Sequence, residues 1–382
     1  MAGAGGIPAI LGFDTAAGAR RVWGMLADPG AERARRHVAR LCRAGLDAGA
    51  LLRAVAAEVR RIVGYDGAAW VTIDPATLLV TGAHVEDLPR ESAPAFYENE
   101  YLHDDVLSFA GLARAGPCVG TLHRATAGDL AASRLHREVA PVSGLRGDSL
   151  RAVFVQARTC WGAVALARRE PHPPFADAEV SFMASIAGAV AEGLRAAVLI
   201  RALGTPAPRG DPPAPGVLVL AGAEVRSASA AAEDWLDELG TGPGGRLHSA
   251  LAALAGAAGA AGDGDPGGPT RTVVRTRAGR WLGVQAVALR PGGEVAVVLD
   301  VARPPEMAEV VMRAYGLSAR ERDVAQRVIA GAPTAEVAAD LHISPWTVQD
   351  HLKSVFDKVG VRSRGELAKQ VFDRHHAPSR PL

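Results

Sequence analysis

The stretch 317–372 near the end of the chain contains four short helical patterns, each with its own start signal. Ser318 and Glu321, three residues apart, form the reciprocal capping pair that opens a helix. Ser344 caps a later helix that has a proline in its first turn, and Gly360 ends that helix. Helix signals at such short intervals predict a small all-α unit with four helices.

The helix that begins at Pro345 carries its apolar residues four, three and four positions apart, so they line a single stripe. Thr334 is expected to cap a shorter helix just before it. Two helices joined by a tight connection, the second apolar on only one stripe, describe a helix-turn-helix. The residues of the stripe are Val348, Leu352, Val355 and Val359.

A longer series of residues at fixed spacing runs through the same unit. It reads G-x-x-T-x-E-V-A-x-x-L-x-I-S-x-x-T-V-x-x-H-L-x-x-x-x-x-K-V-G-V-x-S-R. This pattern resembles the LuxR-type DNA-binding domain of bacterial transcription regulators, and we assign it to residues 316–376. A chance helical hairpin would share the apolar positions but not the polar ones. These polar positions are Thr347, His351, Lys358, Ser363 and Arg364.

The face of the third helix opposite the apolar stripe is polar, and we expect it to enter the major groove of DNA. Lys353 is expected to donate to guanine, Gln349 to pair with adenine and Asp350 to accept from cytosine. The resemblance implies base contacts at the same three positions. Asp350 has a second interpretation, in which it orients Lys353 or His351. Trp346 is expected either to touch a thymine methyl group or to wedge against the preceding helix.

Five further residues are candidates for contacts with the DNA backbone. Thr347, His351 and Lys358 flank the polar face and suit phosphate contacts, as does the capped start of the helix. His351 could instead be a packed, hydrogen-bonded histidine. Arg362 and Arg364 follow the helix and are expected to hold the backbone as well.

The charge of this unit is nearly balanced. Residues 316–376 contain nine Lys and Arg and eight Asp and Glu, so the net charge is +1, as it is for the whole chain. One copy should therefore bind DNA weakly and with strong salt dependence, whereas two copies on an inverted repeat would double the contacts. The resemblance implies that the last helix mediates dimerisation. Here it would use Leu367, Val371 and Phe372.

An α+β pattern precedes this unit. Residues 38–203 read as helix, two strands, further helices, a hairpin of two strands, and a long helix from Asp177 to Leu203. The segment resembles a GAF domain and implies a sensory role. The residues 161–164 (WGAV) and 174–175 (PF), which lie on a late strand and just before the long helix, carry the resemblance. Residues 1–37 form an N-terminal extension with a short helix expected at 20–27.

A second α+β unit follows a linker rich in proline and glycine at residues 204–215. Residues 216–303 read as two short strands, a helix, an Ala-rich helix and an antiparallel meander, and they resemble a compact PAS-like domain. A loop replaces part of its helical middle, so no cofactor is predicted. Residues 304–315 are expected to form a helix that connects this unit to residues 316–376.

Composition places the chain among soluble proteins, with 48% hydrophobic and 22% charged residues. The three cysteines, Cys42, Cys118 and Cys160, lack disulfide or metal-ligand spacing, which suits a reducing cytoplasm. The N-terminus lacks the pattern of a signal peptide. No run approaches eighteen apolar residues without charge, so neither a spanning helix nor a membrane partner is expected.

Other clusters carry little chemistry. Asp104 and Asp105 lack the strand-end pattern of a phosphoryl acceptor, and no hydrolase or nucleotide-binding motif is present, so no enzymatic activity is predicted. Four histidines are scattered without the spacing of a metal or haem site, and four arginines are expected to form a solvated face or an auxiliary DNA or partner contact. The histidines are His84, His103, His123 and His136, and the arginines are Arg271, Arg275, Arg277 and Arg280.

These observations lead to one principal hypothesis and one alternative. The chain is expected to be a cytoplasmic transcription regulator that binds double-stranded DNA as a homodimer. Its partners would include an unidentified small-molecule effector and RNA polymerase, with the signal relayed through the N-terminal units. The alternative is a sensory scaffold whose helix-turn-helix binds protein. The polar face of the third helix distinguishes the two, because a protein-binding face should be more apolar.

Overall fold

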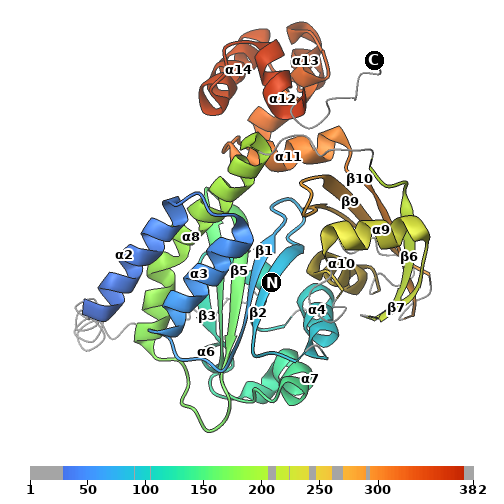
Figure 1. The fold of residues 1–382 in the computed structure, drawn as a ribbon. Coiled ribbons are helices and arrows are strands. Elements are labelled where there is room, and N and C mark those ends of the chain that lie inside the picture. The colour runs from blue at the N-terminus through green and yellow to red at the C-terminus, as the bar shows by residue number, and fades with distance from the viewer. Residues whose placement is uncertain are drawn as a thin grey trace, which may run out of the picture.

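The computed structural model describes residues 29–89, 91–103, 105–204, 212–222, 224–240, 247–259, 270–289 and 293–373 of the 382-residue chain. The helix expected at 20–27 lies outside the described residues, as does most of the linker. The first described helix, α2 (Pro29–Arg43), begins inside the segment that we expected to be an extension. Figure 1 shows two α+β units side by side, with a helical unit above them.

The first unit is built on a five-stranded antiparallel sheet with strand order β2-β1-β5-β4-β3. Helices α2, α3 and α8 pack on one face, and α4 and α5 pack on the other. The elements are β1 (Gly67–Ile73), β2 (Val80–Glu86), β3 (Val119–Thr121), β4 (Ser149–Gln156), β5 (Thr159–Ala167), α3 (Ala48–Arg60), α4 (Ser92–Leu102), α5 (Phe109–Ala115), α6 (Leu122–Ala125), the short helix η1 (Leu130–Ala132), α7 (Arg134–Ser143) and α8 (Asp177–Gly204).

Both faces of this sheet are buried, and alternation along β1 shows why. Trp70 points to the side of α2, α3 and α8, whereas Val71 points to the opposite side. The hairpin of β4 and β5 is confirmed. Its two turn residues, Ala157 and Arg158, have φ angles of 49° and 65°, as the tight primed turns of hairpins require.

The second unit has a five-stranded antiparallel sheet in the order β7-β6-β10-β9-β8, which repeats the order of the first sheet by position. Helices α9 and α10 pack on one face, where Trp235 is fully buried. The strands expected from sequence are confirmed. The elements are β6 (Gly216–Ala221), β7 (Glu224–Ala228), β8 (Arg271–Arg275), β9 (Trp281–Ala288), β10 (Val295–Val301), α9 (Ala230–Leu239) and α10 (Ser249–Gly259).

The two units share one continuous apolar cluster. Val71 and Tyr97 of the first unit belong to the same cluster as Trp235 and Leu251 of the second. Helix α10 packs against both α4 and β9, and the Thr272 hydroxyl donates to Asp74 Oδ2 at 2.8 Å across the boundary. The two units are therefore separated by the linker in sequence but pack directly against each other.

The long helix α8 is 28 residues in length. Residues 177–202 are long and apolar enough to cross a membrane by length and composition, contrary to the expectation that no such segment exists. The helix packs along the first sheet and buries one stripe, as the core helices of soluble proteins also do. Its length and composition are therefore only weak evidence for a membrane span. The stripe consists of Met183, Ile186, Val190 and Leu194.

Helix α11 (Pro304–Ala314) joins the three units. Its Val310 packs with Ala202 of α8 and Trp281 of β9, while its Met312 packs into the C-terminal unit. Arg195 Nη1 of α8 donates to the Ala314 carbonyl at 2.6 Å. The expected connecting helix is therefore present, but it is part of the packed structure and not a free tether.

Candidate nucleic-acid interface

The C-terminal unit consists of α12 (Ala319–Ile329), α13 (Thr334–Asp340), α14 (Pro345–Val359), α15 (Arg364–Ala368) and the π-helical turn η2 (Lys369–Asp373). The capping pair at its start is confirmed: the Glu321 amide donates to Ser318 Oγ, and the Ser318 amide donates to Glu321 Oε2 at 2.6 Å. The expected cap at Thr334 is wrong, because α13 follows Pro333 and has no side-chain cap.

Helix α14 has the expected caps and the expected buried stripe. Ser344 Oγ accepts from the Thr347 amide at 3.0 Å, and Gly360 ends the helix with a φ of 75°. His342, in the turn between α13 and α14, also has a positive φ, 54°. The stripe of Val348, Leu352, Val355 and Val359 is buried against α12 and α13 and against the later helices. Its opposite side must therefore face solvent.

The exposed side of α14 carries the candidate base-reading residues. Gln349, Asp350 and Lys353 are all exposed, and Trp346 retains 77% of its surface. Trp346 therefore does not wedge against α13. Among the described residues, neither Asp350 nor Lys353 has a hydrogen bond or ion pair, and the half-buried His351 has none either. Asp350 thus does not orient Lys353 or His351 in this structure, and both of its charged oxygens stay available.

Thr334 links α13 to two of the candidate residues. Its Oγ1 accepts from Gln349 Nε2 at 3.1 Å and from Arg364 Nη2 at 2.5 Å. Arg364 is therefore anchored at the start of α13, far from its place in sequence. Thr334 is a fixed position of the C-terminal pattern, which is the signal that could have identified it as more than a helix cap. Arg362 is exposed, and its amide donates to Glu366 at 2.8 Å.

Lys358 lies at the end of α14 and already has an ionic partner. Its Nζ donates to both oxygens of the buried Glu321, at 2.8 and 2.7 Å, and Ser354 donates to the same carboxylate at 2.6 Å. Burial raises the pKa of Glu321, but the hydrogen bonds from Lys358, Ser354 and Ser318 outweigh it and hold the pKa at about 2. Any phosphate contact of Lys358 would have to share its ammonium group with this carboxylate.

Replacing Glu321 with glutamine is expected to destabilise α12 and α14 by about 2–4 kcal/mol, because the cap and the ionic partner of Lys358 weaken together. A folded-state pKa below the unfolded value of 4.5 stabilises the fold above pH 4.5, and this contribution is lost as the pH falls towards 2. Hydrogen exchange of the α12 and α14 amides would measure both the destabilisation and its pH dependence. The exposed Glu336 provides the control, and equal protection in Glu321→Gln and Glu336→Gln would contradict the assignment.

The expected dimerisation residues are packed inside their own chain. Leu367 and Val371 are 0% and 1% exposed, and they form one cluster with Ala308 and Met312 of α11. The side chain of Phe372 lies outside the described residues. Gln370 Nε2 donates to the Tyr315 hydroxyl at 3.0 Å, which also joins η2 to the end of α11. In this conformation α11 covers the surface that pairing would use.

The arginines of the second unit, the possible metal ligands and the cysteines are further candidate functional groups in the sequence. Arg271 pairs with Glu306 at 2.5 Å and Arg280 with Glu238 at 3.2 Å, so the expected solvated face is wrong for these two arginines, whereas Arg277 is exposed. Among the residues that the structure describes, no group of three or more His, Cys, Asp or Glu could hold a metal ion. The three cysteines are free thiols.

The fold and the exposed face of α14 define a helix-turn-helix unit of the DNA-binding kind. Residues 316–371 match the model of the family described as bacterial regulatory proteins, luxR family. Spore germination protein GerE of Bacillus subtilis (strain 168) is 36% identical over 56 residues, which cover 15% of this chain and 76% of that protein. This chain therefore belongs to the luxR family of bacterial regulatory proteins.

Two further relatives match over a stretch of about the same length. Transcriptional regulatory protein UhpA of Escherichia coli (strain K12) is 42% identical over 57 residues, which are 15% of this chain but only 29% of UhpA. The probable transcriptional regulatory protein NarL of Mycobacterium tuberculosis (strain ATCC 25618 / H37Rv) is 42% identical over 56 residues, 26% of its length. The chain thus spans less than a third of these two relatives.

Solved structures also align along much of the chain, at low similarity. SdiA in complex with octanoyl-rac-glycerol aligns over 94% of this chain and 96% of that chain, with 13% identity and a TM-score of 0.28. This similarity is too low to support an argument about the fold or the ligand of the N-terminal units.

Proposed function

We propose that this chain is a cytoplasmic, sequence-specific, DNA-binding transcription regulator whose N-terminal GAF-like and PAS-like units modulate DNA binding. The observation that carries the proposal is the exposed face of α14, where Lys353 and Asp350 have no partner within the described chain. Unpaired charged groups at this position of a helix-turn-helix are free to bind base edges in the major groove.

The proposed base contacts are those of Gln349, Asp350 and Lys353. Lys353 donates to guanine, and Asp350 accepts from cytosine, because its negative charge needs a donor beside a polyanion. Gln349 reads adenine after releasing the Thr334 hydroxyl, which it now contacts at 3.1 Å. A hydroxyl partner is easily replaced by a base edge or by water.

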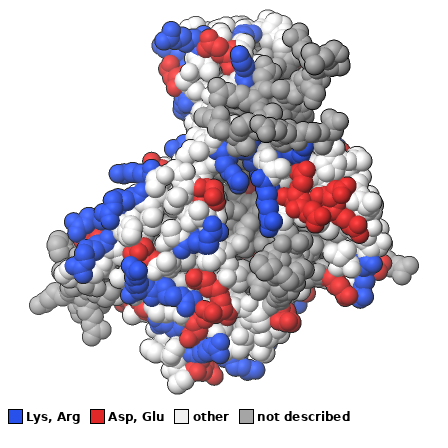
Figure 2. Space-filling model, in the orientation of Figure 1, with Lys and Arg blue, Asp and Glu red and all other residues white. Residues whose placement is uncertain are grey.

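Thr347, His351, Arg362 and Arg364 are proposed to contact the DNA backbone. Arg362 is exposed, and the Thr334 hydroxyl holds Arg364 in place, so a phosphate would meet a preorganised guanidinium. Lys358 is proposed to act mainly by neutralising Glu321, with any phosphate contact secondary. Figure 2 shows basic and acidic side chains interleaved on the C-terminal unit, as expected for its net charge of +1.

Two copies are proposed to bind one DNA site, since a single copy offers few cationic contacts. Pairing through Leu367, Val371 and Phe372 requires α11 to leave the position that it occupies here. The proposed control of DNA binding is therefore a shift between a closed state, in which α11 covers this surface, and an open state, in which two chains can pair. An effector and RNA polymerase are proposed as further partners.

Residues 316–373 alone are expected to bind the DNA site between about five and 150 times more tightly than the full chain without effector, because removing α11 leaves the pairing surface open. The site would first be selected from a random duplex library with the full chain. Fluorescence anisotropy would then give both dissociation constants, and sedimentation would count chains per duplex. Equal affinities, with any candidate effector present or absent, would exclude the relay while leaving DNA binding itself intact.

A protein-binding scaffold is the second candidate, and the 77% exposure of Trp346 favours it. Exposed tryptophan is typical of the centres of protein interfaces. Its neighbours on α14 are polar or charged, which favours DNA. The library selection distinguishes the two functions, because a scaffold would enrich no DNA sequence.

A further inference from the structure

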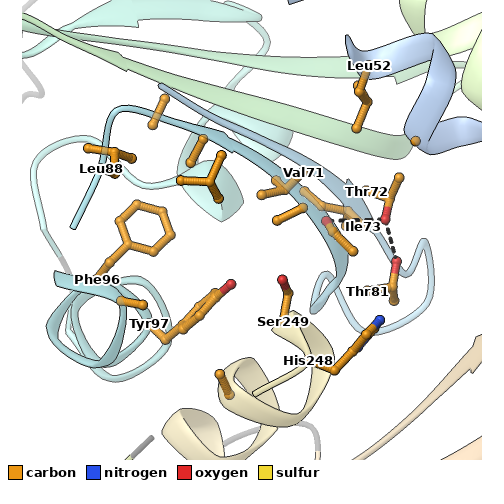
Figure 3. A pocket seen from close by; sticks show the side chains of 18 of the residues that line it. Leu52, Val71, Thr72, Ile73, Thr81, Leu88, Phe96, Tyr97, His248 and Ser249 are labelled. Atoms are coloured by element: carbon orange, nitrogen blue, oxygen red, sulfur yellow. Dashed lines mark hydrogen bonds between the residues drawn. The ribbon is translucent and has the colours of Figure 1, made fainter. Parts of the chain in front are cut away.

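A large cavity lies where the two α+β units meet. Its volume is about 1020 Å³, at the upper end of the range of small-molecule sites. Val71 and Ile73 of β1 and Tyr97 of α4 form its wall in the first unit, whereas His248 and Ser249, at the start of α10, belong to the second unit (Figure 3). Neither unit encloses this space alone.

The walls of the cavity are mainly apolar, with a few hydroxyl groups. Phe96 and Tyr97 from α4 face it together with Val71, and Ala252 lies on the α10 side. Burial raises the pKa of the Tyr97 hydroxyl to about 12, and Ser249 offsets part of this effect. Tyr97 therefore stays protonated and can donate a hydrogen bond. Such walls suit an apolar body with a small number of oxygen atoms.

His248 adds a neutral donor. Burial, with a smaller contribution from Arg277, lowers the pKa of His248 to about 4, so the ring is uncharged near neutral pH. Its Nδ1 accepts from the Ala250 amide at 3.3 Å, which leaves the proton on Nε2. His248 also keeps part of its surface accessible although it lies deep in the protein, because it borders the cavity.

Two arginines line the same cavity without an acidic partner. Arg275 of β8 and Arg201 of α8 form no ion pair among the described residues, and Arg275 Nη1 is buried without a hydrogen bond. Burial, followed by the charge of Arg201, lowers the pKa of Arg275 to about 10. Asp74, which also lines the cavity, accepts from the Thr272 hydroxyl, and Glu238 pairs through Oε1 with Arg280 while its Oε2 is buried without a hydrogen bond; neither acid forms an ion pair with Arg275 or Arg201.

A purely structural role explains only part of the position of Arg275. Its Nε donates to the Gly279 carbonyl at 3.1 Å, and its guanidinium lies 5.1 Å from the centre of the Trp281 ring. These contacts hold the side chain in place. They supply no negative charge to the half-buried Arg275 guanidinium, which lies close enough to Arg201 to feel its positive charge. An anion between the two arginines would supply it.

We propose that this cavity binds an amphipathic organic anion, with its apolar body between α4 and α10 and its carboxylate on Arg275 and Arg201. Figure 2 shows Lys and Arg side chains gathered below the C-terminal unit, where the top of α8 meets the second unit. The apolar walls select the body of the ligand, and the two arginines select its charge.

The location of this site suggests how it controls DNA binding, a consequence that rests on the proposed function. Arg201 belongs to α8, Arg275 to β8 and Val310 to α11, and all three line the cavity. A carboxylate that draws the two arginines together moves two of the elements against which α11 packs. Ligand binding thereby changes how firmly α11 covers Leu367 and Val371.

Isothermal titration calorimetry on the full chain, without DNA, tests the proposal. The probes are benzoate, 1-naphthoate and decanoate, each paired with an uncharged counterpart: benzyl alcohol, 1-naphthalenemethanol and decan-1-ol. The variants are Arg275→Gln and Arg201→Gln, and Arg226→Gln is the control because Arg226 is exposed and pairs with Glu224 at 3.4 Å. Arg201 is also exposed, so Arg201→Gln is expected to fold even if Arg275→Gln does not.

At least one carboxylate is expected to bind once per chain, and its alcohol at least tenfold more weakly. Each cavity arginine variant should weaken carboxylate binding by about ten- to a hundredfold, with Arg226→Gln unchanged. The proposal is overturned if no carboxylate binds, if the alcohols bind equally well, or if every folded cavity variant binds like the wild type. Because DNA is absent, such a failure would not bear on the DNA-binding proposal.

Discussion

Lys353→Ala is expected to abolish the preference of this protein for its selected DNA site over random DNA. The Lys353 ammonium is exposed and unpaired on α14, so it can donate a hydrogen bond to guanine without breaking a contact within the chain. A good contact of this kind discriminates against a wrong base by about 1–3 kcal/mol, and a dimer would lose it in both half-sites. Competition binding of the selected duplex against random duplexes would measure the ratio.

Lys369→Ala is the matched control, because Lys369 is an exposed lysine that belongs to η2 and not to α14. It should weaken binding to all sequences slightly and leave the ratio unchanged. If the Lys353 variant kept its preference for the selected site, Lys353 would not be the reading residue. If both variants lost the preference equally, the effect would come from general charge.

Glu100→Gln is expected to cost about 3–5 kcal/mol of unfolding free energy, the largest stability effect that we anticipate. Arg151 of β4 is fully buried, and its Nη1 donates to Glu100 Oε2 at 2.6 Å and to the Leu107 carbonyl at 2.8 Å. Burial raises the pKa of Glu100, and Arg151 opposes that shift. Removing the carboxylate charge would leave a guanidinium in the core without a counterion. Urea unfolding would measure the loss.

Two further variants separate charge from packing. Glu98 lies on α4, the same helix as Glu100, and forms an ion pair at the surface with Arg134 of α7, so Glu98→Gln should cost no more than about 1 kcal/mol. The double variant Glu100→Leu with Arg151→Met should recover most of the stability lost in Glu100→Gln, because no charge is then left buried. A double variant less stable than Glu100→Gln would show that shape, and not charge, dominates at this position.

Local signals explain how much of the C-terminal unit can be predicted from sequence. The caps at Ser318 and Ser344 and the stop at Gly360 act within one helical turn, so they predict α12 and α14 without knowledge of the rest of the chain. The spacing of the α14 stripe then determines which side faces solvent. The exposed side of α14 that carries Gln349, Asp350 and Lys353 follows from this spacing. Its exposure is confirmed, and its contact with DNA stays a prediction.

Features that depend on distant segments are not predictable in this way. The link from Thr334 to Arg364 joins residues thirty positions apart. Thr334 is the first residue of α13 and not its cap, and its hydroxyl instead accepts from two tertiary partners. The burial of Leu367 depends on α11, and the cavity needs walls from both α+β units. Periodicity identifies a face that must be buried, but it does not identify the segment that buries it.

The apolar cluster shared by the two α+β units limits how this protein can be recombined with others. Sensors and DNA-binding units are often treated as interchangeable parts. A chimera that replaced only the first unit would strip α10 of its contact with α4 and expose apolar surface around Leu251 and Leu254. The two units, 29–301, therefore have to be exchanged together, and the contacts of α11 with both of them have to be rebuilt as well. Any new input specificity must arise by changing both sides of the boundary between the two units.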